Sequence, residues 1–145
     1  MTPREISLIQ NSYRQLGVIT EHAGAIFFAR LFEIEPASRG LFEGDIAAQG
    51  ARMMQTIGYF VISLDQMDVT MKALRQTGLR HAESRISDSL YQAIGDTLLW
   101  TLARCLGTNF TMEVRSAWGK AYWLLAETMK AGTRDGRAQL SRAVA

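Results

Sequence analysis

Cysteine, histidine and proline are all scarce in this sequence. The 145 residues include one cysteine, Cys105, two histidines and two prolines. A single cysteine excludes an internal disulfide framework and any zinc site built from the cysteines of one chain, and it suits a reducing compartment. We therefore expect a cytoplasmic protein.

Long apolar runs and an excess of charge of one sign are also missing. The longest nearly apolar run, GYFVISL at 58–64, is far shorter than a membrane span. The N-terminal segment MTPREISLIQNSYRQ lacks the basic start and apolar run of a signal peptide. The 16 basic and 14 acidic residues leave a net charge of +2. We expect a soluble, unexported protein with no membrane or nucleic-acid partner.

Common catalytic motifs are missing as well. The chain has no HExxH motif, no glycine-rich phosphate loop and no cysteine cluster. The candidates for a chemical site are therefore few.

The chain is long enough, and at 48% hydrophobic enough, for one domain with a proper core. It is too short for two ordinary domains.

The residues that are present favour helices. Thr2, Pro3 and Glu5 form a capping box with proline at the first helical position, and Pro36 stands at a second helix start. Two stripes of apolar residues recur at helical spacing: Ile6, Ile9, Tyr13 and Leu16, then Ile26, Phe27, Leu31 and Phe32. The pattern predicts an all-α chain.

Further helices are predicted over about 45–64, 69–81, 87–106 and 111–129. Ser87 and Thr111 are suitable N-cap residues for the last two. The final segment has two glycines, mixed charges and little apolar periodicity. We expect an ordered domain over 1–131 and a frayed or flexible tail over 132–145.

His81 is the first candidate for a metal ligand. It stands in GLRHAESRI at the end of a modest amphipathic segment, where a neutral imidazole can coordinate a metal. By itself this pattern is weak, because a histidine near a helix end is more often a surface or hydrogen-bonded residue.

An ordered series of segments, from near Ile6 to Met129, resembles the globin family. FFARLFEIEPASRGLF resembles the second and third globin helices, LRHAESRI with YQAIGDTLLWTLARCLGTNF resembles the proximal histidine segment and the helix after it, and WGKAYWLLAETM resembles the last helix. The likeness is greatest to the globin part of bacterial flavohaemoglobins, to stand-alone bacterial globins and to neuroglobin. It implies a globin fold, a three-over-three helical sandwich enclosing haem b.

This resemblance assigns roles around the iron. His81 corresponds to the proximal ligand, Phe42 to the phenylalanine that stacks on the haem, and Gln49 to the distal residue whose amide can donate to a bound ligand. Met53, one turn after Gln49, is expected to close the pocket, with thioether ligation as a lesser alternative. Phe28 stands where flavohaemoglobins usually carry a tyrosine.

Further contacts implied by the resemblance have ordinary alternatives. Arg52 and Arg80 can pair with haem propionates or be solvated surface residues. Ile86 and Tyr91 correspond to proximal-side positions, although Tyr91 can equally be a core residue. Thr133 falls where flavohaemoglobins carry a glutamate that works with that tyrosine, so we expect an incomplete proximal relay.

Other residues are assigned structural roles. In the register that the resemblance implies, Gly24 and Gly50 lie where two globin helices cross closely, with chance placement among the 12 glycines as the alternative. His22 is interpreted as a surface residue, and Cys105 as a small buried hydrophobe rather than a reactive thiol. Core positions are expected for Trp100, Trp118 and Trp123.

Three functions remain open on these grounds. The leading one is reversible binding of oxygen, nitric oxide or carbon monoxide at ferrous haem, with no catalytic residue assigned. The second is a nitric oxide dioxygenase that depends on an external reductase. The third is a regulatory globin that senses gas or lacks haem and acts through a protein partner. The oligomeric state is left open.

Overall fold

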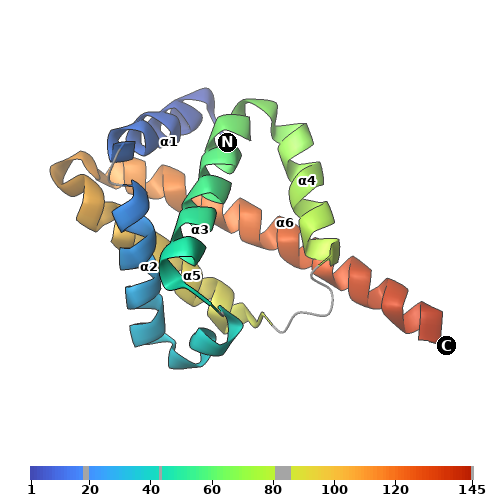
Figure 1. Ribbon diagram of the computed structural model, residues 1–145. Helices are drawn as coiled ribbons and strands as arrows, with labels where there is room; N and C mark the ends of the chain where they lie inside the picture. Colours follow the sequence, from blue (N-terminus) through green and yellow to red (C-terminus); the bar gives the residue numbers. More distant parts are fainter. Residues whose placement is uncertain (18–19, 43, 81–85, 145) are drawn as a thin grey trace.

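The computed structural model describes residues 1–17, 20–42, 44–80 and 86–144, and in these residues it contains helices and no strands. The helices are α1 (Pro3–Leu16), α2 (Thr20–Ile34), η2 (Pro36–Leu41), α3 (Ile46–Ile62), η3 (Ser63–Gln66), α4 (Met67–Arg80), α5 (Asp88–Leu106), η4 (Gly107–Asn109) and α6 (Met112–Val144). Figure 1 shows α6 running across the molecule behind α3. The predicted all-α class is confirmed.

Polar caps begin the helices where the sequence indicates. Thr2 accepts from the backbone N–H of Glu5, whose side chain accepts in return, so the capping box is present. Asp45 caps α3 through the N–H of Ala47, and Ser87 caps α5 through the N–H of Leu90. The predicted starts near 45 and at 87 are therefore confirmed.

The core consists of two clusters of buried side chains. The larger joins α1, α2, α3, η3, α5 and α6 around Ile9, Leu64 and Trp118. The smaller joins α2 and α5 around Phe28, Leu31 and Leu90. Met53 and Leu98 pack against both clusters and so connect them.

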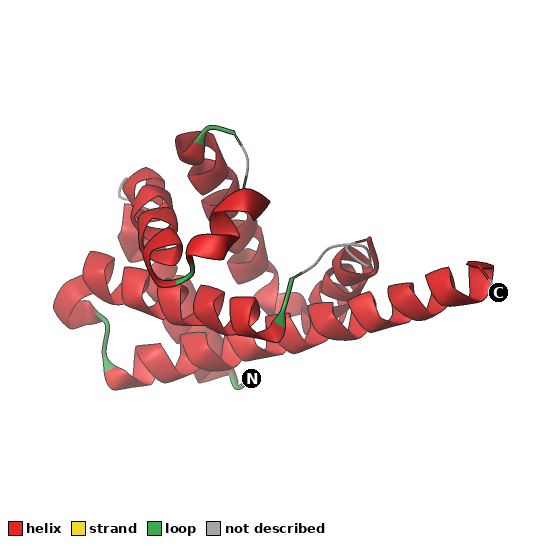
Figure 2. Cartoon of the chain, turned by 90° about the horizontal axis from the view of Figure 1, so that it is seen from below, coloured by secondary structure: helices red, strands yellow, loops and turns green. Residues whose placement is uncertain are grey.

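The end predicted for the last helix, at Met129, is wrong. The helix α6 continues to Val144, and its C-terminal end projects beyond the other helices (Figures 1 and 2). Gly132 is buried, and the Asp135 carboxylate pairs with Arg75 of α4. Packing against α4 thus stabilises a helix over residues for which the sequence predicts fraying. The free energy of this packing outweighs the low helix propensity of the glycines.

The predicted core position is also wrong for one of the three tryptophans. Trp118 is 1% exposed, and its indole N–H donates to the Ser12 hydroxyl at 2.8 Å. Trp123, nearly one and a half turns later on α6, is 65% exposed, so its predicted core position is wrong. A helix turns by about a hundred degrees per residue, which places positions 118 and 123 on different faces.

Candidate functional site

An apolar cavity of about 140 Å³ lies between α2, α3, α5 and α6. Its lining comprises Phe27, Met53, Ile57, Phe60, Ile94, Leu98, Trp118, Tyr122 and Leu125. Burial raises the pKa of the Tyr122 hydroxyl, which keeps that side chain neutral. The cavity therefore suits an uncharged, apolar group.

A close crossing of α2 and α3 determines one wall of this cavity. A Cβ on Gly24 would lie 2.6 Å from the carbonyl oxygen of Gly50, and a Cβ on Gly50 would lie 2.9 Å from the carbonyl carbon of Gly24. Only glycine permits this approach, so the predicted crossing is confirmed. Phe27 and Met53 each follow one of these glycines by three residues, and both line the cavity.

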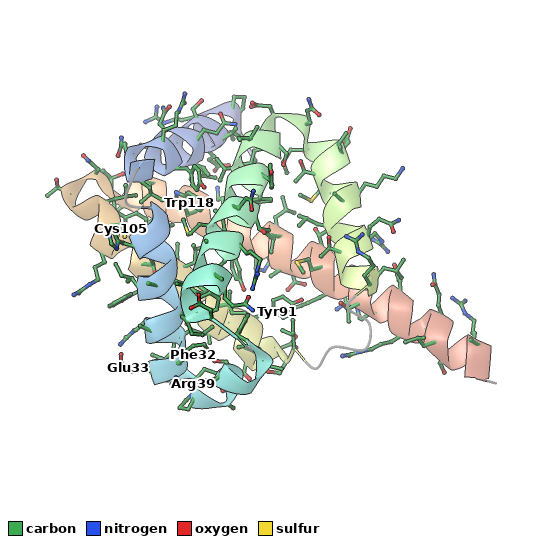
Figure 3. The ribbon with its side chains drawn as sticks, in the orientation of Figure 1. Phe32, Glu33, Arg39, Tyr91, Cys105 and Trp118 are labelled. Carbon is green, nitrogen blue, oxygen red and sulfur yellow. The ribbon has the colours of Figure 1, made fainter. Side chains whose placement is uncertain are left out.

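Aromatic rings pack beside this wall. The Phe28 ring, 2% exposed, lies 5.0 Å from the half-buried Phe42 ring and 5.3 Å from the Phe27 ring, both in edge-to-face geometry. Phe32, labelled in Figure 3, extends the group to the end of α2. Ile86 packs against the same cluster. The structure thus brings together Phe28, Phe42, Met53 and Ile86.

The polar candidates on α3 and α4 lie nearer the surface. Gln49 is half-buried and stands one helical turn before Met53, on the same face of α3. Arg52 is exposed. Arg80 is the last residue of α4 and is exposed, with its guanidinium donating to the Thr77 hydroxyl at 3.3 Å.

Tyr91 lies in a different hollow. Its side chain, labelled in Figure 3, is 8% exposed. It borders a space of about 290 Å³ between α5 and α6. The Lys130 ammonium sits 5.1 Å from its ring centroid, and burial raises the pKa of its hydroxyl. Tyr91 does not border the apolar cavity, although Tyr122, which donates to the Tyr91 carbonyl oxygen, borders both spaces.

His81 falls in 81–85, outside the described residues, so its predicted role as an iron ligand stays a prediction. Among the residues that are described, no three histidine, cysteine or acidic side chains are grouped so as to hold a metal ion. His22 is exposed on α2, as predicted. Cys105 is half-buried against the larger core cluster, and burial raises the pKa of its thiol, which is the opposite of what a reactive thiolate requires.

Several cavity residues were missed by reasoning from the sequence. Ile57 follows Met53 by four residues, and Leu98 follows Ile94 by four, which is the spacing of neighbours on one helix face. That spacing was a usable signal for Ile57, because Met53 was already assigned to the pocket. Nothing in the local pattern of α6 singles out Tyr122 or Leu125 from other core residues.

No helix in the described part of the chain is long and apolar enough to cross a membrane. The chain is 27% identical to neuroglobin-1 of Oncorhynchus mykiss over 146 aligned positions, which cover 91% of this chain and 92% of that protein. It is 28% identical to a flavohemoprotein of Xylella fastidiosa (strain 9a5c) over 89% of this chain and 33% of that protein.

Among solved structures, the haemoglobin of the botfly Gasterophilus intestinalis superimposes with a TM-score of 0.80 at 15% identity, covering 92% of this chain and 99% of the botfly protein. This likeness confirms the predicted globin fold. Globins as a family bind gases through haem. The globin family model matches residues 25–129 of this chain. The chain therefore belongs to the globin family.

Proposed function

We propose that this globin binds haem b through His81 and reversibly takes up oxygen and other diatomic gases. The observation that carries the proposal is the apolar cavity that Met53 borders, beside the packed rings of Phe28 and Phe42. A gas held at haem needs an apolar site with few polar groups, and the lining of this cavity is apolar.

The residues present fit the chemistry of haem. The porphyrin face is apolar, and its two carboxylates lie on one edge. At about 140 Å³ the cavity is smaller than the roughly 300–1,000 Å³ of typical cofactor pockets, so it would accommodate part of such a group. Arg52 and Arg80 are exposed cations on α3 and α4 that can pair with the carboxylates. When bound, haem supplies the iron that coordinates the gas.

Gln49 is the candidate hydrogen-bond donor to the gas. Its side-chain amide carries two N–H donors, and it lies one turn from Met53 on the same face of α3. Phe28, at the position where flavohaemoglobins usually carry a tyrosine, has no hydroxyl and is fully packed among other rings. Oxygen would therefore be held mainly through Gln49, while Ile86 and Tyr91 remain proposed proximal-side contacts.

Absorption spectroscopy of the purified protein after haem addition tests the proposal. A Soret band that shifts on exposure to carbon monoxide is expected for the native chain, and its loss is expected in His81→Ala. His22→Ala is the matched control, because His22 is the other histidine and lies exposed on α2. A native chain without a Soret band would contradict haem binding and favour a haem-free regulatory role with a protein partner.

A second candidate function is nitric oxide dioxygenation with a separate reductase. The observation in its favour is the similarity to the flavohemoprotein, of which this chain spans a third. That activity would convert nitric oxide and oxygen to nitrate with one electron per turnover, which a separate reductase would supply through the haem. Sustained nitrate formation with an added reductase is expected if this activity operates, whereas a single turnover without regeneration would favour simple gas binding.

We propose that this globin acts in the cytoplasm and that its globin domain spans residues 1–131, with α6 continuing past that boundary along α4. The lone cysteine, half-buried and with a raised thiol pKa, is compatible with a reducing compartment. Cell fractionation tests the location.

A further inference from the structure

Two glycines bring α4 and α6 into backbone contact. A Cβ on Gly78 would overlap the carbonyl oxygen of Met129, and a Cβ on Gly132 would overlap the carbonyl oxygen of Arg75 and lie 3.0 Å from the backbone nitrogen of Leu79. Backbone atoms cannot move aside as the tip of a long side chain can. The last turns of α4 are thus held against α6 at a distance that only glycine allows.

Two side-chain hydrogen bonds hold α4 and α6 together at this crossing. The Thr133 hydroxyl, half-buried, donates to the carbonyl oxygen of Gly78 at 2.9 Å. The Arg75 Nε donates to the Asp135 carboxylate at 3.1 Å. One helix is thereby fixed in register against the other, because a shift of either would break the hydroxyl bond and force the glycines out of contact.

The segment of α4 held in this way lies directly before the candidate iron ligand. Gly78 precedes His81 by three residues. Gly132, Thr133 and Asp135 all lie beyond residue 129, where the match to the globin family model ends. The contact therefore involves the C-terminal part of α6, where the sequence predicts fraying.

We propose that the contacts of Gly78, Gly132 and Thr133 fix the end of α4 against α6 and thereby determine the position of His81. Thr133 is then a positioning residue for the proximal side. This inference rests on the proposed binding of haem through His81. Thr133 does not take up the role of an acidic partner of Tyr91. Its hydroxyl is committed to the backbone of α4.

The test compares Thr133→Val with Thr133→Ser. Valine matches threonine in shape and lacks the hydroxyl, whereas serine keeps it. In the ferrous, ligand-free protein, resonance Raman spectroscopy reports the iron–histidine stretching band. We expect the band to shift and broaden in Thr133→Val and to return to the native position in Thr133→Ser. A native band in Thr133→Val, with a native Soret band, would overturn the inference and leave haem binding intact.

A second measurement follows the crossing itself. Amide hydrogen exchange at Leu79 and Arg80 should be about fivefold faster in Thr133→Val, as expected for a lost hydrogen bond of about 1 kcal/mol. Unchanged exchange would contradict the role of this hydrogen bond. Should Thr133→Val fail to fold, Asp135→Asn weakens the same crossing at an exposed ion pair and is expected to shift the same band. An unshifted band in that variant would also overturn the inference.

A control separates local effects from general ones. Gly119 lies on α6, and no atom lies within 4 Å of the place that an alanine methyl group would take there, so Gly119→Ala should leave the stretching band unchanged. Gly132→Ala, which forces α6 away from α4, should shift it. Equal bands in these two variants would contradict this positioning role, and a native chain without any Soret band would instead refute the proposed function.

Discussion

Gly24 and Gly50 are in backbone contact where α2 crosses α3, with 2.6 Å between the place of a Gly24 Cβ and the Gly50 carbonyl oxygen. This contact brings the wall residues Phe27 and Met53 to the same cavity. The short distance between α2 and α3 thus depends on two glycines, which have no side chain, rather than on interlocking side chains.

Gly24→Ala should lower the free energy of unfolding by about 1–3 kcal/mol, because the new methyl group must push two backbones apart. Chemical denaturation measures this. Gly119→Ala, at an open position of α6, is the control and should be neutral or stabilising by up to about 1 kcal/mol. Equal stability of the two variants would contradict the tight crossing.

Ser12→Ala should destabilise the chain by about 1–3 kcal/mol, because it leaves the buried indole N–H of Trp118 without its acceptor. Thermal or urea unfolding gives the value. Ser7→Ala removes an exposed hydroxyl on the same helix and should change stability little. A stable Ser12→Ala variant would show that another acceptor replaces the serine.

Gln49→Leu should raise the oxygen dissociation rate about three- to tenfold if the proposed function holds, because a hydrogen bond of about 1 kcal/mol to the bound gas is lost. Stopped-flow displacement of oxygen by carbon monoxide measures the rate. Gln55→Leu is the control, since Gln55 is exposed on α3 and bonds to Tyr59. An unchanged rate in Gln49→Leu would count against the assigned donor.

Glu5 should contribute to acid sensitivity. The Lys120 ammonium donates to its carboxylate, and this bond, together with the N–H of Thr2, lowers the pKa of Glu5 below its ordinary value of 4.5. A carboxyl with a lowered folded-state pKa stabilises the fold above its unfolded pKa, and this stabilisation is lost as the pH falls through the folded value.

The matching experiment is a comparison of melting temperatures for the native chain and Glu5→Gln. The difference should be present at neutral pH and shrink as the pH falls below about 4.5. The effect should be small, because the Lys120 side chain of the pair is exposed and dissolved salt screens the interaction. A difference independent of pH would contradict this contribution from the Glu5 charge.

Most of the helix starts could be predicted from the sequence, because each depends on local chemistry. Thr2 with Glu5, Asp45 and Ser87 bond to backbone groups within three residues of themselves. The end of α6 could not be predicted in this way. Gly132 disfavours a helix locally, and only contact with α4 shows that it is a packing position.

The candidate site likewise contains some residues that the sequence predicts and others that it does not. Met53, Phe28 and Phe42 were predicted from their places in the globin series, and the structure brings them together. Tyr91 borders a separate hollow. Tyr122 and Leu125, which line the cavity from α6, are 65 or more residues away from Ile57 in sequence. Such long-range neighbours leave no local pattern.

The all-α class and the helix caps follow from the order of the amino acids, since they depend on short-range spacing, and the register that the globin resemblance implies adds the glycine crossing at Gly24 and Gly50. Three features depend instead on how distant segments pack: α6 is helical past Met129, Trp123 is exposed, and Thr133 is bonded to Gly78. How far α6 extends and which of its faces is covered depend on segments far apart in the chain, whose packing free energy outweighs local helix propensity.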